Sequence, residues 1–314
     1  MNKKIAMVGI SIAVGSAMLF ATAFSAMAGT SGYDTYKSAI KNTLTAKSYG
    51  VDMKVSITDN GSALINADYA VKRNSDSGNM SQNITVKSGD STKSTETYGQ
   101  DGKTITKSSD SDVYNVMTLP TEKTGAAGKI RERSLQGKMD PQAIQDDEKI
   151  LDALVGNLQN YVLVDSKTDG TKEISAQLTN TQIPALANAV TSFLVKRAGS
   201  TERMGPAKIN SVDSTLLGTM PKLTSDISID SADMKAELDN NNFITSQVGN
   251  IVISGKDADG NSHSITVDID MSMSGFNSTT PDTVDLTGKQ VKTTQMKKFR
   301  NFDNSHNNGA AENK

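Results

Sequence analysis

The feature that most restricts the fold of this chain is a strict alternation of apolar and polar residues. In the two clearest segments, apolar residues stand at every second position: Val51, Met53, Val55 and Ile57, and then Ile265, Val267, Ile269, Met271 and Met273. A period of two puts every second side chain on the same face of a β-strand, so each segment has one apolar and one polar face. An apolar sheet face has to pack against something, so a second layer is needed.

Short turns separate such segments in two runs of the sequence. Asp59-Asn60-Gly61 and Asp257-Ala258-Asp259-Gly260 contain residues that tolerate positive φ or form tight turns. Strands joined in this way form antiparallel meanders, here from Val51 to Met117 and from Ile227 to Met273. Within the second run, one strand is expected around Ile227 and Ile229, and a separate one is expected over Met234, Ala236 and Leu238.

Three segments have the periodicity or capping of helices. Tyr33–Lys47 has an apolar stripe with a four-residue period, made of Tyr33, Tyr36, Ile40 and Leu44. A second helix begins at Asp140-Pro141, which supply an N-cap and a first helical residue, and runs to about Leu158. The third covers Thr181–Ala198. Between the last two, Tyr161–Val164 and Lys172–Leu178 are expected to pair as a hairpin.

The order helix, meander, helix, hairpin, helix, meander predicts an α+β fold. The two meanders are expected to form one large curved antiparallel sheet, a half-open barrel, with about three helices packed on its concave apolar face. A two-sheet sandwich would satisfy the same alternation, so it stays open as an alternative.

The N-terminus has the features of a secretory signal peptide. Lys3 and Lys4 precede the uncharged apolar run Ile5–Phe24, and Ala26-Met27-Ala28 gives the small-x-small pattern of a cleavage site. Retention of the run as a membrane anchor is the alternative, because its length approaches that of a spanning helix. The chain has no cysteine, which excludes a lipoprotein anchor and any disulfide.

The expected domain organisation follows from these features. Residues 1–28 form the signal peptide, 29–290 a single β-rich extracytoplasmic domain, and 291–314 a flexible polar tail. The expected location is the bacterial cell envelope or the exterior. Cleavage after Ala28 leaves 31 basic and 35 acidic residues, a balance of −4 that argues against nucleic acid as a partner. Aromatic residues are scarce, which counts against stacking of carbohydrate.

The chain has no complete motif for catalysis or for metal binding. The chain has two histidines, His263 and His306, and no pair with the spacing of metal ligands. The Asp257–Asn261 turn lacks the length and the closing glutamate of a calcium-binding EF-hand loop. Ser38-x-x-Lys41 and Lys123-Thr-Gly match two elements of penicillin-recognising enzymes but lack the third element between them. The sequence therefore predicts a non-enzymatic protein without a cofactor or a metal.

The order of elements, from the Tyr33–Lys47 helix to about Leu286, resembles the LolA/LppX-like superfamily of lipoprotein carriers and lipid-binding envelope proteins. The resemblance implies a half-open antiparallel barrel, capped by helices, around an apolar cavity that binds a lipid or acyl chain without chemistry. The chain departs from the pattern in one respect: several family members are lipid-anchored through a cysteine, and this chain has none.

The leading functional prediction is a secreted or envelope non-enzymatic protein that holds a lipid or another apolar ligand between sheet and helices. The residues expected to line the cavity or the core are Met53, Val55, Ile57, Ile265, Val267 and Ile269. The methionines suit either an adaptable binding surface or ordinary core packing. The alternative function is a structural or regulatory envelope protein with a packed core, which would contact a protein partner through the polar sheet face or the 200–221 loop.

Overall fold

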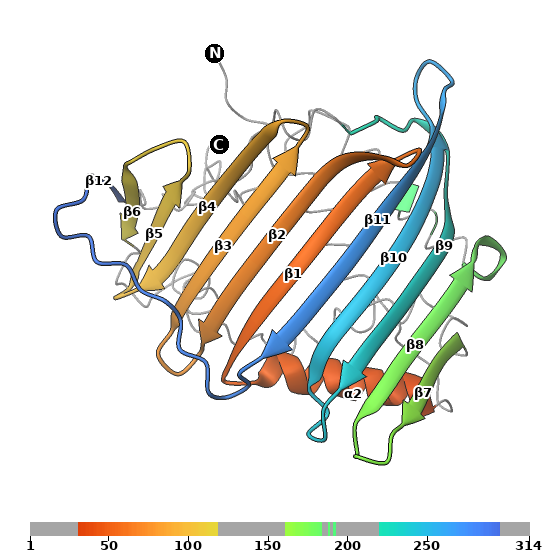
Figure 1. The fold of residues 1–314 in the computed structure, drawn as a ribbon, viewed down its shortest axis with the longest axis horizontal. Coiled ribbons are helices and arrows are strands. Elements are labelled where there is room, and N and C mark those ends of the chain that lie inside the picture. The colour runs from red at the N-terminus through yellow and green to blue at the C-terminus, as the bar shows by residue number, and fades with distance from the viewer. Residues whose placement is uncertain (1–30, 119–160, 184–187, 189–190, 193–219, 296–314) are drawn as a thin grey trace, which may run out of the picture.

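The computed structural model describes residues 31–118, 161–183, 188, 191–192 and 220–295, and these residues build one open sheet (Figure 1). The sheet has 12 strands in the order β12-β6-β5-β4-β3-β2-β1-β11-β10-β9-β8-β7. Neighbouring strands are antiparallel except β12 and β6, which are parallel. The sheet does not close, since β12 and β7 are its two edges.

The strands fall into two runs along the chain, followed by an edge strand. The first run is β1 Ser48–Asp59, β2 Ser62–Asn74, β3 Asn79–Ser88, β4 Ser91–Gln100, β5 Lys103–Ser108 and β6 Tyr114–Thr118. The second run is β7 Val162–Ser166, β8 Lys172–Thr179, β9 Ser225–Leu238, β10 Ile244–Lys256 and β11 Ser262–Ser274, and the edge strand is β12 Val291–Gln295. The predicted β7–β8 hairpin is confirmed.

The two runs join into a single sheet because the first strand of one pairs with the last strand of the other. In the β1–β11 ladder, Val55 lies opposite Ile269 and Ile57 lies opposite Val267. The apolar faces of the two runs are therefore continuous. This confirms one large antiparallel sheet and excludes the two-sheet sandwich for the described residues.

The β1–β2 turn has the conformation that its residues predict. Asn60 has a φ of 49° and Gly61 a φ of 81°, which is the left-handed region that Asn and Gly tolerate. The tight turn fixes the β1–β2 register and keeps Val55 and Ile57 on the same face as Ala67 and Ile65.

Strand β9 differs from the expectation of two separate strands. It runs unbroken from Ser225 to Leu238, but its pairing with β10 shifts register between Val252 and Ile253. An extra residue in one strand moves the side chains that follow to the other face. The apolar residues accordingly change parity from Ile227 and Ile229 to Met234. In the sequence this change of parity suggested a break between two strands. In the structure it is caused by a bulge within one strand.

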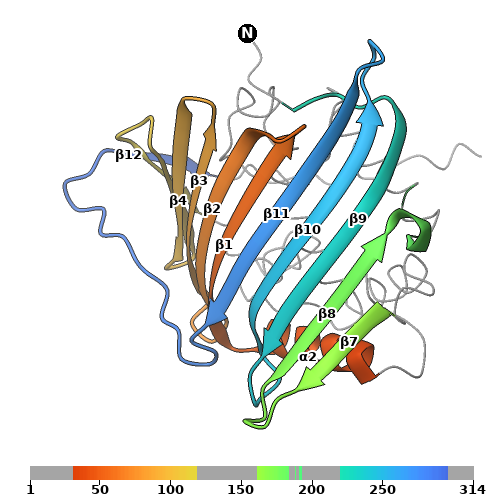
Figure 2. The same cartoon turned by 45° about the vertical axis from the view of Figure 1, so that its right-hand side comes forward.

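The first helix, α2, covers Ser31–Thr45 and crosses the sheet at the ends of β7 to β10 (Figure 2). Tyr33, Tyr36 and Ala39 are buried against the sheet as part of the core. Leu44, which the four-residue period placed on the buried stripe, is 37% exposed, and its neighbour Thr43 is buried instead. A period of 3.6 residues drifts away from a strict spacing of four, which moves the buried face to Thr43 by the last turn.

The other two predicted helices lie mostly outside the described residues. The Asp140–Leu158 helix falls entirely outside them. At the start of the predicted Thr181–Ala198 helix, Asn180–Gln182 form a 3-10 turn, η2, and Asn188, Thr191 and Ser192 are helical. Only α2 is therefore described in full, instead of three helices. Among the described helices, none is long and apolar enough to span a membrane.

The segment between β11 and β12, residues 275–290, crosses one face of the sheet and is called the strap here (Figure 1). Gln100 binds the main chain of Val284 at both its N–H and its carbonyl, at 2.8 and 3.0 Å. Asp282 accepts a 2.8 Å hydrogen bond from Lys72 and donates its N–H to Ser81 at 3.0 Å. The strap leads into β12, which extends the sheet through residues 291–295 that were expected in the tail.

Candidate functional site

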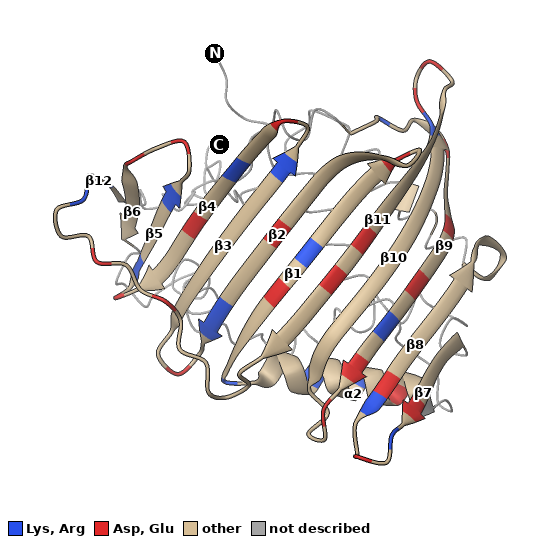
Figure 3. Cartoon of the chain, viewed as in Figure 1, with Lys and Arg blue, Asp and Glu red and all other residues tan. Residues whose placement is uncertain are grey.

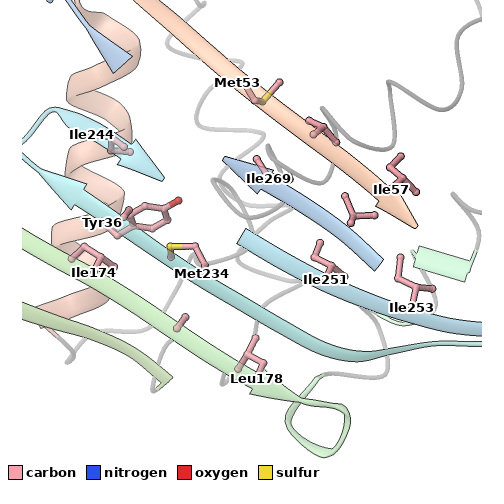
Figure 4. Packing of buried hydrophobic residues seen from close by; sticks show 14 of the residues in the cluster. Tyr36, Met53, Ile57, Ile174, Leu178, Met234, Ile244, Ile251, Ile253 and Ile269 are labelled. Atoms are coloured by element: carbon pink, nitrogen blue, oxygen red, sulfur yellow. The ribbon is translucent and has the colours of Figure 1, made fainter. Parts of the chain in front are cut away.

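The six predicted lining residues all lie on one face of the sheet, called the apolar face here. Met53, Val55, Ile57, Ile265, Val267 and Ile269 are buried, and they belong to one hydrophobic cluster. The cluster extends over β1, β2, β3, β7, β8, β9, β10 and β11 and includes Tyr36 of α2. Figure 4 shows part of it. The alternation thus identified which side chains gather on this face. Whether a ligand contacts them stays a prediction.

Methionine is concentrated at the middle of the apolar face. Met53 and Met271 lie directly opposite each other on β1 and β11, and Met234 lies two strands away on β9. Met53 and Met234 are buried, and Met271 is partly buried. Unbranched, polarisable side chains adapt to irregular apolar shapes, so this part of the face can repack around different contents.

One polar pair lies within the apolar cluster. The hydroxyl of Tyr36 donates a 2.8 Å hydrogen bond to Oε1 of Gln247, and both side chains are buried. Burial raises the pKa of the Tyr36 hydroxyl far above its ordinary value, so it stays neutral. The pair fixes α2 over β10 with a directional contact that apolar packing alone lacks.

The opposite face of the sheet, the polar face, carries a groove of about 960 Å³, called the transverse groove here. Its lining side chains occupy two cross-strand rows that run over seven strands, from β2 to β7. One row is Asp68, Lys54, Asp270, Val248, Lys235, Ser175 and Leu163. The other is Asn66, Ser56, Asp268, Asn250, Asp233, Gln177 and Tyr161.

Two of the predicted lining residues, Val55 and Ile269, also border the transverse groove. Their side chains are buried on the apolar face. Because successive side chains of a strand point to opposite faces, these two residues border the groove through their main chain. The groove is thus separate from the predicted ligand cavity and lies behind it, across the thickness of the sheet.

The transverse groove is predominantly acidic, with four aspartates and two lysines in its lining. Figure 3 shows acidic and basic positions along β2, β1, β11 and β9. Lys235 forms an ion pair with Glu173 at 2.9 Å, and Asp268 accepts a 2.6 Å hydrogen bond from Asn250. Within the described residues, the other four charged side chains of the lining have no hydrogen bond or ion pair: Lys54, Asp68, Asp233 and Asp270. These four side chains are available to a ligand.

One end of the groove is apolar. Val248 on β10 is 44% exposed, Leu163 on β7 is 64% exposed and Tyr161 is 38% exposed. All three line the groove, although they lie on the polar face. Large apolar side chains gathered on a surface mark contact sites more often than isolated ones do. The groove therefore has a charged end over β2, β1 and β11 and an apolar end at β7. Val248 lies at the middle of the groove and is separated from Leu163 by Lys235 of β9 and Ser175 of β8.

A third cluster lies at one end of the sheet, around His263 of β11. Its Nδ1 lies 2.8 Å from Oδ2 of Asp59, and its Nε2 lies 3.3 Å from Oδ2 of Asp257. The hydrogen bond with Asp59, and then that with Asp257, raises the pKa of His263. Hydrogen bonds from Asn261 lower the pKa of Asp257 to about 2. The cluster connects the β1–β2 turn to the β10–β11 hairpin.

The part of the chain that the structure describes contains no candidate metal site. No three His, Asp or Glu side chains there are arranged to hold a metal ion. The Asp257 carboxylate is instead used within its own turn, where Oδ1 accepts the N–H groups of Asp259 and Asn261 at 2.9 and 2.8 Å. These contacts explain the Asp- and Gly-rich sequence as turn chemistry.

The transverse groove was not predicted from the sequence. The alternation that identified the apolar face also identifies its polar counterpart, so Lys54, Asp268 and Asp270 could have been assigned to the opposite face. The sequence gives no sign that β9, β8 and β7 continue the same surface, because that depends on the order of strands in the sheet. The exposure of Leu163 likewise depends on the tertiary structure.

Comparisons with protein-family models and with curated protein sequences found no match. Among solved structures, a LolA superfamily protein from Nitrosomonas europaea matches with 8% identity and a TM-score of 0.21, over 78% of this chain and 94% of that one. Lipovitellin matches with 8% identity and a TM-score of 0.26, over 76% of this chain and 26% of that one. A LolA superfamily protein is thus among the solved structures to which this chain is similar. Both TM-scores are below 0.5, so neither match assigns a function.

Proposed function

We propose that the mature chain is an exported, non-enzymatic binding protein that holds an apolar ligand, such as an acyl chain, against the apolar face of its sheet. The observation that carries the proposal is the extent of this face. Buried apolar side chains continue over eight strands, whereas the one fully described helix, α2, crosses only the ends of β7 to β10. The predicted helices Asp140–Leu158 and Thr181–Ala198 would complete the layer around the ligand.

Three features of the apolar face support a ligand. The sheet is open, so strands do not enclose the apolar face on every side. Met53, Met271 and Met234 provide an adaptable centre. Small residues lie beside them, since Ala236 and Ala176 are buried on β9 and β8. Small residues on an apolar face leave room that a flexible chain can fill.

Recovery of the native protein followed by lipid extraction and mass spectrometry tests the proposal directly. A stoichiometric apolar molecule is expected, and none should be recovered after denaturation and refolding in lipid-free buffer. The refolded protein is then titrated with a fluorescent fatty acid. Absence of both a co-purified lipid and fatty-acid binding would exclude an apolar ligand of this kind.

The substitution Ala236→Phe separates a ligand site from a packed core. Ala236 is fully buried on the apolar face. If the added ring enters ligand space, fatty-acid affinity falls at least tenfold and the stability of the ligand-free protein changes little. If the interior is packed, overpacking lowers the free energy of unfolding by about 1–3 kcal/mol. Ala70→Phe, at an exposed position of β2, is the matched control.

The proposal includes export through the N-terminal segment. Expression in a bacterium with a Sec pathway should give a protein whose N-terminal sequence begins at Gly29. Ala28→Leu is expected to block cleavage and leave the chain attached to the membrane, because signal peptidase requires a small residue there. A soluble product that still begins at Met1 would contradict this part of the proposal.

A second function has a specific observation in its favour. An envelope interaction protein with a packed core would need a surface for its partner on the polar face, and the transverse groove lies on that face. Strong destabilisation by Ala236→Phe, together with no bound lipid, would favour this function over the first.

A further inference from the structure

The polar face already binds one extended segment, which is the strap. Its main chain is held by side chains of the sheet: Gln100 makes two hydrogen bonds to Val284, and Ser81 accepts the N–H of Asp282. Lys72 adds a charged contact to Asp282 at 2.8 Å. An amide side chain that binds both groups of one residue can replace the contacts of a neighbouring strand.

The strap also buries apolar side chains on this face. Val284 and Leu286 pack on a small cluster of Ile105, Tyr114 and Val116 from β5 and β6. Residues 282, 284 and 286 alternate in the manner of an extended chain, with one charged contact followed by two apolar ones. Half of the polar face is thus organised to hold an extended segment by amide, charge and apolar contacts together.

The transverse groove, on the other half of this face, offers the same three kinds of contact: amide, charged and apolar. Asn66 and Gln177 are amides without a hydrogen bond among the described residues. Asp68, Asp270 and Asp233 supply unpaired charge of the sign opposite to Lys72. The apolar contribution comes from exposed Leu163 and Tyr161 at the β7 end and from exposed Val248 at the middle. The described residues of the chain place no segment over these side chains.

The dimensions of the groove favour an extended chain over a helix. Its two rows of side chains are two residues apart along each strand, which is about 7 Å. A helix with its side chains is about 10–12 Å wide and would rest on top of the rows. Seven strands at a spacing of about 4.8 Å give a length of about 29 Å, which about nine extended residues span.

We propose that the transverse groove binds an extended segment of a protein partner, with lysine or arginine over Asp268 and Asp270 and apolar residues over Val248 and Leu163. The acidic excess of the lining selects a basic segment. The apolar end of the groove fixes the direction in which the bound segment lies. An apolar residue of the segment contacts β7 at the edge of the sheet, and its basic residues lie toward β2 and the middle of the sheet. This inference is independent of the apolar ligand, which would contact the opposite face.

Fluorescence anisotropy with the full mature chain tests the inference. The probe is a labelled peptide of about nine residues in which lysine alternates with serine, one leucine stands at one end and a second leucine stands about four residues from it. A second probe replaces each lysine with glutamate. The lysine peptide is expected to bind and the glutamate peptide is not. The double variant Asp268→Lys/Asp270→Lys is expected to reduce affinity for the lysine peptide at least tenfold.

A control variant with the same change in net charge distinguishes a general electrostatic effect from binding in the groove. Asp90 and Asp112 are exposed and lie outside the groove, so Asp90→Lys/Asp112→Lys changes the net charge by the same amount. Its affinity should stay within about twofold of the unaltered chain. Failure of the unaltered chain to bind, or an equal loss in both double variants, would overturn the proposal. Val248→Ser/Leu163→Ser should weaken only the probe that contains leucine.

Discussion

The hydroxyl of Tyr36, in the only fully described helix, donates a 2.8 Å hydrogen bond to the side chain of Gln247 on β10, and both groups are buried. The two residues are 211 positions apart in the sequence, so the bond joins the first element of the domain to its second meander. A buried polar group that loses its partner destabilises a protein more than a well-made pair stabilises it.

Removal of either partner of this pair is expected to lower stability. Tyr36→Phe and Gln247→Leu should each reduce the free energy of unfolding by about 1–3 kcal/mol, because the remaining buried polar group loses this hydrogen bond. The combination Tyr36→Phe/Gln247→Leu should cost less than the sum of the two. Urea denaturation of the four proteins measures this coupling, and additive losses would show that the bond does not fix α2.

Addition of a methyl group to Gly32 is expected to displace α2. A Cβ at this position would clash with the carbonyl oxygen of Val162 and lie 3.0 Å from the carbonyl carbon of Leu163, and both are main-chain atoms of β7. Gly32→Ala should lower the free energy of unfolding by about 1–3 kcal/mol, although alanine favours helix. Ser38→Ala, at an exposed position of the same helix, should be neutral. Thermal and urea unfolding compare the two, and equal stabilities would contradict the close packing of α2 on β7.

The His263 cluster predicts a pH-dependent contribution to stability. The pKa of His263 is raised above its ordinary value of 6.5 by Asp59 and Asp257, so the folded state binds a proton more tightly than the unfolded state. The contribution is therefore fully present below pH 6.5 and is lost as the pH rises through the raised pKa. His263→Gln should lower the melting temperature more at about pH 5.5 than at about pH 8.5.

The chain supplies a matched control for this measurement. His263 is the histidine that contacts Asp59 and Asp257, so a substitution at the only other histidine of the sequence, His306→Gln, should leave this pH dependence of the melting temperature unchanged. Equal effects of His263→Gln at both pH values would show that the imidazole contributes no charged contact. The contribution of Asp257 to stability belongs to a different pH range, since it is lost only as the pH falls from 3.8 through about 2.

The strap should depend on Gln100 more than on its exposed ion pair. Gln100→Ala removes two hydrogen bonds to the main chain of Val284 and should increase amide exchange in β12, because the strap leads directly into that strand. Asp282→Ala should cost less than about 1 kcal/mol, since Lys72 is 47% exposed and Asp282 is 60% exposed. Hydrogen exchange with mass spectrometry compares the two. A larger effect of Asp282→Ala would assign the main role to the ion pair.

Local patterns predicted the strands and the first helix well. The β1–β2 turn at Asn60-Gly61 and the β10–β11 hairpin lie where the turn residues indicated. The errors occur where a pattern has two structural causes. In β9 the change of parity after Ile229 was interpreted as a break between strands, and it is a bulge. In α2 a period of four placed Leu44 on the buried face, which Thr43 occupies instead.

The sequence by itself determined which side chains share a face, because the side-chain period of a strand is fixed by its backbone geometry. That is why Val55, Ile57, Val267 and Ile269 could be assigned to one buried surface before any fold was known. The tertiary structure alone decided which strands are neighbours, including the β1–β11 pair and the parallel β12–β6 pair. Such long-range pairing depends on the packing of whole segments and leaves no local pattern. The transverse groove depends on that strand order, since its lining residues are brought together only when β1 and β2 lie in one sheet with β7 to β11.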